Sequence, residues 1–421
     1  MFGVRQQAAR PADQRPARAP GRATRQIPTQ TRPRKLPLRQ ERSMAFIPTT
    51  RRAVLAGLVL STAVFAAPAF AEKAKIKIGF MGPLSGGNAQ QGLGARNGFL
   101  LAIEQANAGP AGKYEIEPVV LDDASDPQTG VGAAMKLVND PDVVAATGHW
   151  NSPVALATMP VFARFQTPLV IWGAISPAIT EQNLPEVTRV TPTLLTENQP
   201  LAEWMVKELG AKRIAVIADT SDYGKSNAEA IAEFVPAAGG EVVSTDLLPV
   251  GSTDFRTVLT SLKGKQVDAV YFGGVITEAG ILARQMKEVG LDKPMLGISG
   301  FYDPEFIAVA GDAAANTIVS YPVASQTPKL ARMEADYQAR GFAEPMSPYT
   351  KYAFDAANII IQAINEAGVE DKARLAEAIR AIQHDGATGQ ITFDANGQTQ
   401  TPIAIELKTV KDGAWTTYAK S

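Results

Sequence analysis

Polar side chains that could bind a charged small molecule follow the ends of several expected strands. Ser152 comes after the apolar run Val143–Thr147 and directly precedes Pro153, where a helix is expected to begin. A helix N-terminus offers free backbone N–H groups and a partial positive charge, which suits a carboxylate. A serine that only caps the helix fits the same pattern. We therefore expect Ser152 to contact an anionic ligand or to cap the helix.

A second candidate, Glu278, opens the helix expected after the apolar strand Asp268–Phe272. A carboxylate at this place could pair with a ligand ammonium group. A glutamate in the first turn also stabilises a helix through the helix dipole, without any ligand. The pattern leaves both interpretations open, and the spacing of Glu278 from Gly273 and Gly274 favours the ligand contact.

Aromatic residues occupy loops at comparable strand ends. Trp150, Tyr223, Phe301 and Tyr302 lie in such loops, and Asn151 stands between Trp150 and the serine that follows it. Their rings could form the wall of a site for an apolar or aromatic ligand. Packing in the core or at a hinge explains each of them equally well.

Other chemistry finds little support in the sequence. The chain has no Cys and only two histidines, His149 and His384, and it contains neither a G-x-S-x-G elbow nor a P-loop. The neighbours Asp122 and Asp123 lie on one expected strand, so their side chains point to opposite faces and are interpreted as loop-capping groups. His149 could touch a ligand, but one histidine makes neither a metal site nor a catalytic centre. We expect no catalytic residues, no cofactor and no metal.

Strands and helices alternate in two successive series along the sequence. The candidate side chains described above follow the ends of these strands, so the strands determine where they lie. The first series runs from Lys75 to Ile171 and the second from Arg213 to Ile298. Strands separated by helices of this length indicate parallel βαβ units. The expected fold is therefore α/β, with two doubly wound parallel-sheet lobes joined by a multi-strand hinge. Ligands of such sheets bind beyond the carboxyl ends of the strands, which here means between the lobes.

Proline-containing segments mark the expected crossings between the lobes, near Thr191–Thr193 and Tyr321–Pro322, because proline and the residue before it resist helix formation. Residues 72–192 and 324–392 are assigned to an N-terminal lobe. Residues 193–323 and 393–421 are assigned to a C-terminal lobe.

The N-terminal 71 residues are interpreted as a disordered basic extension followed by an export signal peptide that starts at Met44. Arg51 and Arg52 form its positive region, Ala53–Phe70 its uncharged region, and cleavage is expected after Ala71. The arginine pair resembles a twin-arginine signal, an ordinary Sec signal fits almost as well, and a retained membrane helix is a third interpretation. We expect a periplasmic protein.

Removal of this segment changes the charge of the chain. Residues 1–71 carry 13 basic and 2 acidic side chains, so 28 basic and 40 acidic side chains remain of the 41 and 42 in the full sequence. Phosphate contacts supply most of the affinity for nucleic acid, so an acidic protein without a basic run is a poor nucleic-acid binder. Nucleic acid is therefore not an expected partner.

Several short motifs occur together in one order: Ile78–Gly86, Asp122–Pro127, Tyr223-Gly224, and Tyr271–Gly274 followed by Glu278. From about Lys75 to its C-terminus the chain resembles the leucine/isoleucine/valine-binding protein family of periplasmic receptors. The resemblance implies a type I periplasmic binding fold whose two lobes close on a ligand and deliver it to an ABC permease. Members of this family mostly bind amino acids, and others bind amides, urea or aromatic acids.

The resemblance also assigns roles to residues. It implies that Ser152 donates its hydroxyl to a ligand carboxylate and that Glu278 pairs with an ammonium group. In amino-acid binders a further hydroxyl comes from the turn that here reads Gly173-Ala174-Ile175-Ser176. Aligned on Pro177, this sequence places Ile175 where that hydroxyl usually lies, with Ser176 beside it. This departure weakens the assignment of an amino-acid ligand.

The expected function is that of a periplasmic, monomeric solute-binding component of an ABC importer, and not of an enzyme. The expected ligand is a small carboxylate-bearing molecule, first an apolar or branched-chain amino acid and second an aromatic carboxylate. A sensor module with the same fold is the alternative.

Overall fold

The computed structural model describes residues 73–110 and 112–419. The expected N-terminal extension and export signal lie outside the described residues. Among the helices that are described, none combines the length and the apolar character needed to cross a membrane.

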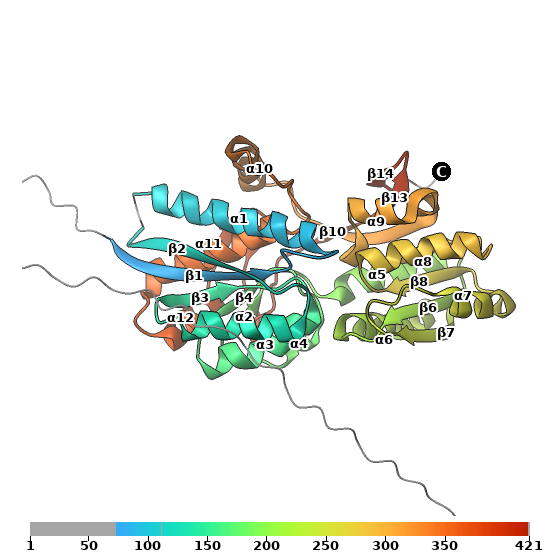
Figure 1. The fold of residues 1–421 in the computed structure, drawn as a ribbon, viewed down its shortest axis with the longest axis horizontal. Coiled ribbons are helices and arrows are strands. Elements are labelled where there is room, and N and C mark those ends of the chain that lie inside the picture. The colour runs from blue at the N-terminus through green and yellow to red at the C-terminus, as the bar shows by residue number, and fades with distance from the viewer. Residues whose placement is uncertain (1–72, 111, 420–421) are drawn as a thin grey trace, which may run out of the picture. The chain divides into compact units, whose positions relative to one another are not determined.

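The first sheet consists of five parallel strands in the order β2-β1-β3-β4-β5. Helices α1 and α11 pack together on one face of this sheet, and α2 and α3 pack together on the other (Figure 1). Because both faces are covered, the central strands are continuous apolar runs and not alternating ones. The bounds of the strands are β1 (Ala74–Gly82), β2 (Tyr114–Asp122), β3 (Val143–Thr147), β4 (Leu169–Ile171) and β5 (Val187–Arg189).

The helices associated with this sheet come from two distant parts of the chain. The N-terminal group comprises α1 (Ala89–Ala108), α2 (Pro127–Asn139), α3 (Ser152–Arg164) and the short α4 (Ala178–Glu181). The later group comprises α10 (Pro328–Arg340), α11 (Thr350–Ala367) and α12 (Lys372–Arg380), with a small hairpin of β11 (His384–Gly386) and β12 (Gly389–Ile391).

The second sheet has seven strands in the order β14-β13-β10-β9-β8-β6-β7. Strands β6 to β10 are parallel, and the C-terminal pair β13 and β14 adds to one edge in antiparallel orientation. The bounds are β6 (Arg213–Asp219), β7 (Glu241–Leu248), β8 (Ala269–Gly273), β9 (Met295–Ile298), β10 (Thr317–Val323), β13 (Ala404–Lys411) and β14 (Ala414–Thr417).

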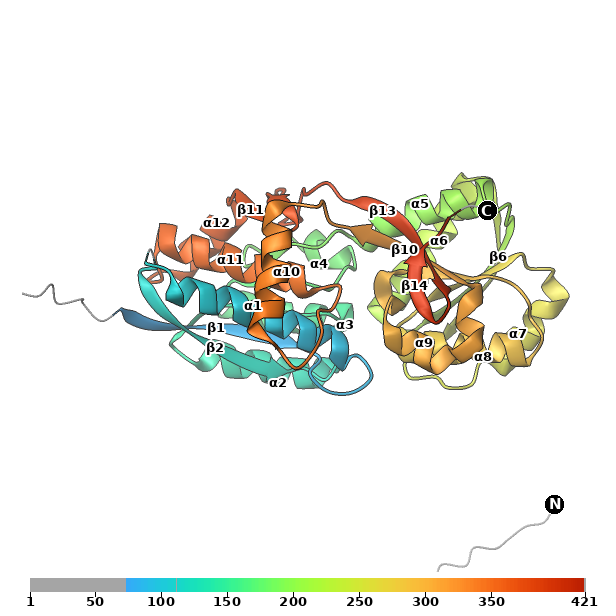
Figure 2. The same cartoon turned by 90° about the horizontal axis from the view of Figure 1, so that it is seen from above.

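Helices cover both faces of the second sheet as well. Helices α5 and α6 pack together on one face, and α7, α8 and α9 lie on the other (Figure 2). Their bounds are α5 (Leu194–Lys207), α6 (Asp222–Ala237), α7 (Arg256–Leu262), α8 (Ile276–Glu288) and α9 (Pro304–Ala310), with 3₁₀ turns η1 (Lys263–Lys265), η2 (Ser299–Phe301) and η3 (Gly311–Asn316).

The chain passes three times between the two sheets: after β5, after β10 and after β12. A connection of several strands therefore joins them, as the sequence predicts, and the α/β fold with two parallel sheets is confirmed. The described part of the chain thus forms two similar α/β halves, and the segment that carries α10 to α12 returns to the first half between β10 and β13 of the second.

A carboxylate is buried beside these crossings. Glu197 on α5 is 1% exposed, and its two carboxylate oxygens accept hydrogen bonds from the backbone N–H and the hydroxyl of Ser299, both at 2.9 Å. Burial raises the pKa of Glu197 to about 8, although both hydrogen bonds act in the opposite direction. These hydrogen bonds do not offset the lost hydration of the charged form, so the protonated form is favoured at neutral pH.

Candidate functional site

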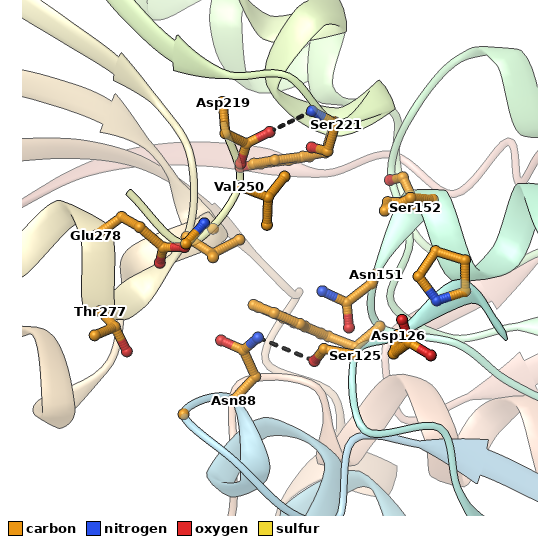
Figure 3. Close-up of a pocket in the computed structure, with 18 of the residues that line it drawn as sticks. Asn88, Ser125, Asp126, Asn151, Ser152, Asp219, Ser221, Val250, Thr277 and Glu278 are labelled. Atoms are coloured by element: carbon orange, nitrogen blue, oxygen red, sulfur yellow. Dashed lines mark hydrogen bonds between the residues drawn. The ribbon is translucent and has the colours of Figure 1, made fainter. Parts of the chain in front are cut away.

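A cavity of about 600 Å³ lies at the carboxyl ends of the strands of both sheets (Figure 3). Loops after β1 to β4 line it from the first sheet, and loops after β6 to β9 line it from the second, together with Tyr349 at the start of α11. This is the position that the general rule for open α/β sheets gives. Seven of the candidates from the sequence line the cavity: Trp150, Asn151, Ser152, Gly173, Ile175, Tyr223 and Glu278.

Ser152 is the first residue of α3, and the N-terminus of this helix borders the cavity. The hydroxyl oxygen of Ser152 accepts a hydrogen bond from the backbone N–H of Ser176 at 3.2 Å. That contact leaves the hydroxyl hydrogen free to donate to another group. Asn151 is the N-cap residue but makes no side-chain capping bond, and its Oδ1 accepts no hydrogen bond from the described residues. The helix N-terminus therefore keeps donors for an anionic group.

The turn after β4 is held from behind by a buried arginine. Arg189 is fully buried and donates to the carbonyl of Ser176 at 2.6 Å and to the side chain of Gln398 at 2.8 Å. Burial lowers the pKa of Arg189 to about 9. A Cβ on Gly173 would lie 2.9 Å from the Cα of Trp150, so only glycine fits there.

Two members of this turn do not line the cavity. Ala174 and Ser176 are fully buried, and the Ser176 hydroxyl lies 3.3 Å from the hydroxyl of Ser226 on α6. The expectation that Ser176 borders the ligand is therefore corrected, because its side chain is directed at another helix. Ile175 does line the cavity and presents an apolar surface to it.

The wall formed by the second sheet is acidic. Glu278 is the third residue of α8, and its Oε1 accepts a hydrogen bond from the backbone N–H of Gly251 at 3.0 Å. Asp219, at the end of β6, accepts from the backbone N–H of Ser221 at 2.8 Å. Burial raises the pKa of Glu278, and the nearby Asp219 adds to the increase. Burial likewise raises the pKa of Asp219.

The charges around the cavity are unbalanced. Its lining contains the three acidic side chains Asp126, Asp219 and Glu278, and none of the described lining residues is Lys or Arg. Figure 3 shows Glu278 and Ser152 on different sides of the hollow, on loops of different sheets. The arrangement suits a ligand with a cationic group toward the acidic wall and an anionic group toward the N-terminus of α3.

Aromatic rings provide much of the apolar surface between these two ends. The rings of Trp150 and Tyr349 pack edge to face with centroids 6.2 Å apart. Tyr223 on α6 is 8% exposed, and a Cβ on Gly300 would collide with its hydroxyl, so the chain must approach closely there. Burial raises the pKa of Tyr223 well above its ordinary value, which keeps the phenol neutral.

The aromatic candidates Phe301 and Tyr302 do not line the cavity. Phe301 is fully buried, with its ring 6.2 Å from that of Phe272. The ring of Tyr302 packs on those of Tyr321 and Trp415, at 4.3 Å and 5.0 Å. Phe301 ends the 3₁₀ turn η2 with its ring in the core, and the half-buried Tyr302 packs on other aromatic rings, so the expectation that they wall the site is corrected.

The adjacent aspartates at the end of β2 act on loops, as the sequence predicts. Asp122 accepts hydrogen bonds from the backbone N–H groups of Leu84 and Ala124 and from the hydroxyl of Ser85. Partial burial opposes these bonds, but together they lower the pKa of Asp122. His149 does not reach the cavity, since it is fully buried in a polar contact with Asp123.

Other lining residues were not singled out from the sequence. They come from the segments after β1, β2, β6 and β7, from the N-terminal part of α8, and from the residue before α11: Asn88, Ser125, Asp126, Asp219, Ser221, Val250, Gly251, Ser252, Thr253, Val275, Thr277, Ile281 and Tyr349. Among them, Asp219 and Ser221 carried a detectable signal, because Asp219 ends the strand that precedes Tyr223 and Ser221 lies between the two. Tyr349 carried none, since it belongs to a distant segment.

Within the described residues no group of three or more His, Cys, Asp or Glu side chains is placed to hold a metal ion. The cavity instead combines a helix N-terminus, an acidic wall and aromatic rings, and it lies at the carboxyl ends of the strands of both sheets. This fold and this site define a receptor for a small molecule.

The comparisons with known proteins agree with that class. The family model described as periplasmic binding protein matches residues 75–411. The chain belongs to this periplasmic binding protein family, which confirms the resemblance in the sequence. It is 33% identical to the leucine-, isoleucine-, valine-, threonine- and alanine-binding protein of Pseudomonas aeruginosa, over 76% of this chain and 86% of that protein.

Solved structures show the same relationship. A leucine-binding protein from Thermotoga maritima superposes with a TM-score of 0.74 and 26% identity, covering 82% of this chain and 98% of that one. The branched-chain amino acid transporter substrate-binding protein of Streptococcus pneumoniae, in complex with isoleucine, gives a TM-score of 0.72 and 26% identity, covering 82% and 99%.

Proposed function

We propose that this chain is the periplasmic solute-binding component of an ABC importer and that it binds an apolar, branched-chain α-amino acid in the cavity. One observation carries the proposal: the N-terminus of α3 with Ser152 and the carboxylate of Glu278 face the same hollow from different sheets, with apolar rings in between. The names of the similar proteins, which bind leucine, isoleucine and valine, support the same ligand class.

In the proposed complex each end of the amino acid meets a complementary group. The ligand carboxylate accepts the free hydroxyl hydrogen of Ser152 and backbone N–H groups at the start of α3. The ammonium group pairs with Glu278. Trp150, Tyr223 and Ile175 enclose the apolar side chain, which leaves water on binding. Binding stabilises a state in which the two halves close around the ligand.

The similar proteins are solute-binding proteins, and we propose that this chain likewise binds its ligand without transforming it. It acts as a monomer and hands the ligand to an ABC permease of the inner membrane. The family is periplasmic, and export by a twin-arginine or Sec signal at Met44–Ala71 is the proposed route.

We also propose lobe boundaries close to those drawn from the sequence. One lobe comprises residues 72–192 and 324 to about 401, where the boundary expected from the sequence lies at 392, and the other comprises residues 193–323 and the C-terminal segment after about residue 401. The supporting observation is that Gln398 pairs with Arg189 at the end of β5, which belongs to the first sheet.

Calorimetric titration of the purified protein with L-leucine tests the ligand assignment. A hydrogen bond to a charged group contributes about 1.5–3 kcal/mol, so Ser152→Ala is expected to raise the Kd by roughly 10- to 150-fold. Thr327→Ala is a matched control, since Thr327 caps α10 away from the cavity. Unchanged leucine affinity in Ser152→Ala would remove the carboxylate contact from the proposal.

An aromatic carboxylate is the second candidate ligand. It is favoured by Ile175, which stands where a hydroxyl is expected in amino-acid binders, and by the rings of Trp150, Tyr223 and Tyr349 around the cavity. Titration with benzoate distinguishes the candidates. Binding of benzoate without binding of leucine would replace the first candidate by the second.

A further inference from the structure

A buried chain of three polar side chains lies directly behind the cavity wall of the first sheet. The Nδ1 of His149 is 2.7 Å from the Oδ2 of Asp123, and its Nε2 is 2.9 Å from the hydroxyl of Thr158. All three residues are fully buried. Burial of three polar groups is costly unless each is hydrogen-bonded, and here each is.

The chain has the residue types of a nucleophilic triad but cannot act as one. Neither Thr158 nor His149 lines the cavity, so no ligand atom can reach the hydroxyl. The hydroxyl of Thr158 also lies 3.1 Å from the carbonyl oxygen of Ala155, which can only accept.

Each member of the chain is connected to a different segment that borders the cavity. Asp123 accepts the backbone N–H of Ser125 at 3.0 Å and so fixes the loop after β2. The carbonyl oxygen of His149 accepts the backbone N–H of Ala174 at 2.9 Å and so fixes the turn after β4. Thr158 lies on α3, whose first residue is the proposed carboxylate contact Ser152.

We propose that Asp123, His149 and Thr158 form a positioning chain that sets the relative placement of the three ligand-facing loops of the first sheet. The loop after β3 is the central one, because it continues from His149 into Trp150, Asn151 and Ser152. Side chains that hold a site in place from behind act on affinity through geometry, without touching the ligand.

The first test needs no ligand. In ¹⁵N–¹H spectra of the free protein, Thr158→Val is expected to shift the backbone amide signals of Ser125 and Ala174, which belong to the two other loops. Thr158→Ser, which keeps the hydroxyl, is expected to restore them. Thr388→Val is the matched control, since Thr388 is equally buried and its hydroxyl donates to Asp355 away from the cavity. Shifts confined to α3 in Thr158→Val would overturn the proposal.

The second test measures affinity and rests on the proposed function. By calorimetry at 25 °C, Thr158→Val is expected to raise the Kd for L-leucine roughly tenfold, and Thr158→Ser to return it to within about threefold of the wild type. Thr388→Val is expected to lower the melting temperature without changing the Kd.

The outcomes separate the two proposals. If the wild-type protein does not bind leucine, the proposed ligand is wrong and the amide shifts alone decide on the positioning chain. The other outcome is that the wild type binds leucine and Thr158→Val binds it equally well, with a lower melting temperature. In that case the three residues only support the fold, and the positioning role is refuted.

Discussion

Replacement of Glu278 by glutamine removes the negative charge from the acidic wall while keeping the local structure. The amide oxygen of the introduced glutamine can still accept the hydrogen bond from the backbone N–H of Gly251, which lies 3.0 Å from the Glu278 carboxylate in the wild type. The substitution therefore separates the proposed ammonium contact from the role of this side chain in the loop after β7.

The expected loss follows from the position of Glu278 in the cavity wall. Two unit charges about 3 Å apart attract each other by roughly 5–6 kcal/mol at an effective dielectric constant of about 20, and much of this is offset by lost hydration. Hydrogen bonds to charged groups contribute about 1.5–3 kcal/mol net. Glu278→Gln is therefore expected to raise the Kd for L-leucine by roughly 10- to 150-fold.

The pH dependence gives a second, independent signature. Burial raises the pKa of Glu278 in the free protein, and Asp219 contributes to the increase. A protonated carboxyl no longer attracts an ammonium group, so wild-type affinity for leucine is expected to fall as the pH is lowered through this raised pKa. The affinity of Glu278→Gln should change less over the same range, because, among the described residues of this wall, Asp219 is then the one remaining carboxyl whose pKa is raised.

Calorimetric titrations at several pH values between 5 and 8 measure both effects. Glu305→Gln is the control, because Glu305 occupies the first turn of α9 and is exposed outside the cavity. A role in the helix dipole alone would affect stability by about 0.3–1 kcal/mol and leave the Kd unchanged. A Kd for Glu278→Gln within twofold of the wild type, with the same pH profile, would refute the ammonium contact.

Three further outcomes are expected. The pKa of Glu197 is raised from 4.5 to about 8 in the folded protein, so its contribution to stability is lost as the pH rises through this window. The melting temperature of the wild type should therefore fall more between pH 5 and pH 9 than that of Glu197→Gln, and equal slopes would contradict this. Gly173→Ala is expected to weaken leucine binding at least tenfold, because the added methyl group would displace Trp150; calorimetry that finds wild-type affinity would show that the turn can relax. Ile175→Thr adds a hydroxyl to the cavity lining, at the place in the turn after β4 where amino-acid binders are expected to carry one, and should lower the Kd for leucine severalfold; a titration that finds weaker binding would favour an aromatic ligand.

The fold was predictable because its parallel strands carry a strong signal. Strands buried on both faces, such as β6 and β8, read as short apolar runs between helices of regular length. Helix α5 was not predicted. Pro200 lies inside it, and Glu197 and Asn198 put polar side chains on its buried face, so the helical spacing of its apolar residues is interrupted in the first turns. Packing against α6 and β10 stabilises it instead.

The site was predictable only in part. Trp150, Ser152 and Glu278 were found because they directly follow buried parallel strands, and the carboxyl ends of these strands form the cavity wall. Phe301 follows β9 in the same way, but the 3₁₀ turn there directs its ring into the core. The direction of a side chain within a tight turn depends on backbone angles that residue types alone do not specify.

Long-range contacts account for the rest. Tyr349 reaches the cavity from a segment about 200 residues away from Trp150 in the sequence, and the two rings meet edge to face. Local sequence patterns do not show that His149 is the partner of Asp123 either. The two residues meet because β2 and β3 end at the same edge of the sheet. No local pattern identifies such pairs.

Thermal denaturation of the purified protein with L-leucine, with benzoate or without addition shows whether this chain binds an apolar amino acid. A ligand at about a hundred times its Kd stabilises the folded state by roughly 2.7 kcal/mol, which corresponds to an increase of a few degrees in melting temperature. We expect this increase with L-leucine and a smaller increase or none with benzoate. An increase with benzoate alone, or with neither compound, would contradict this expectation.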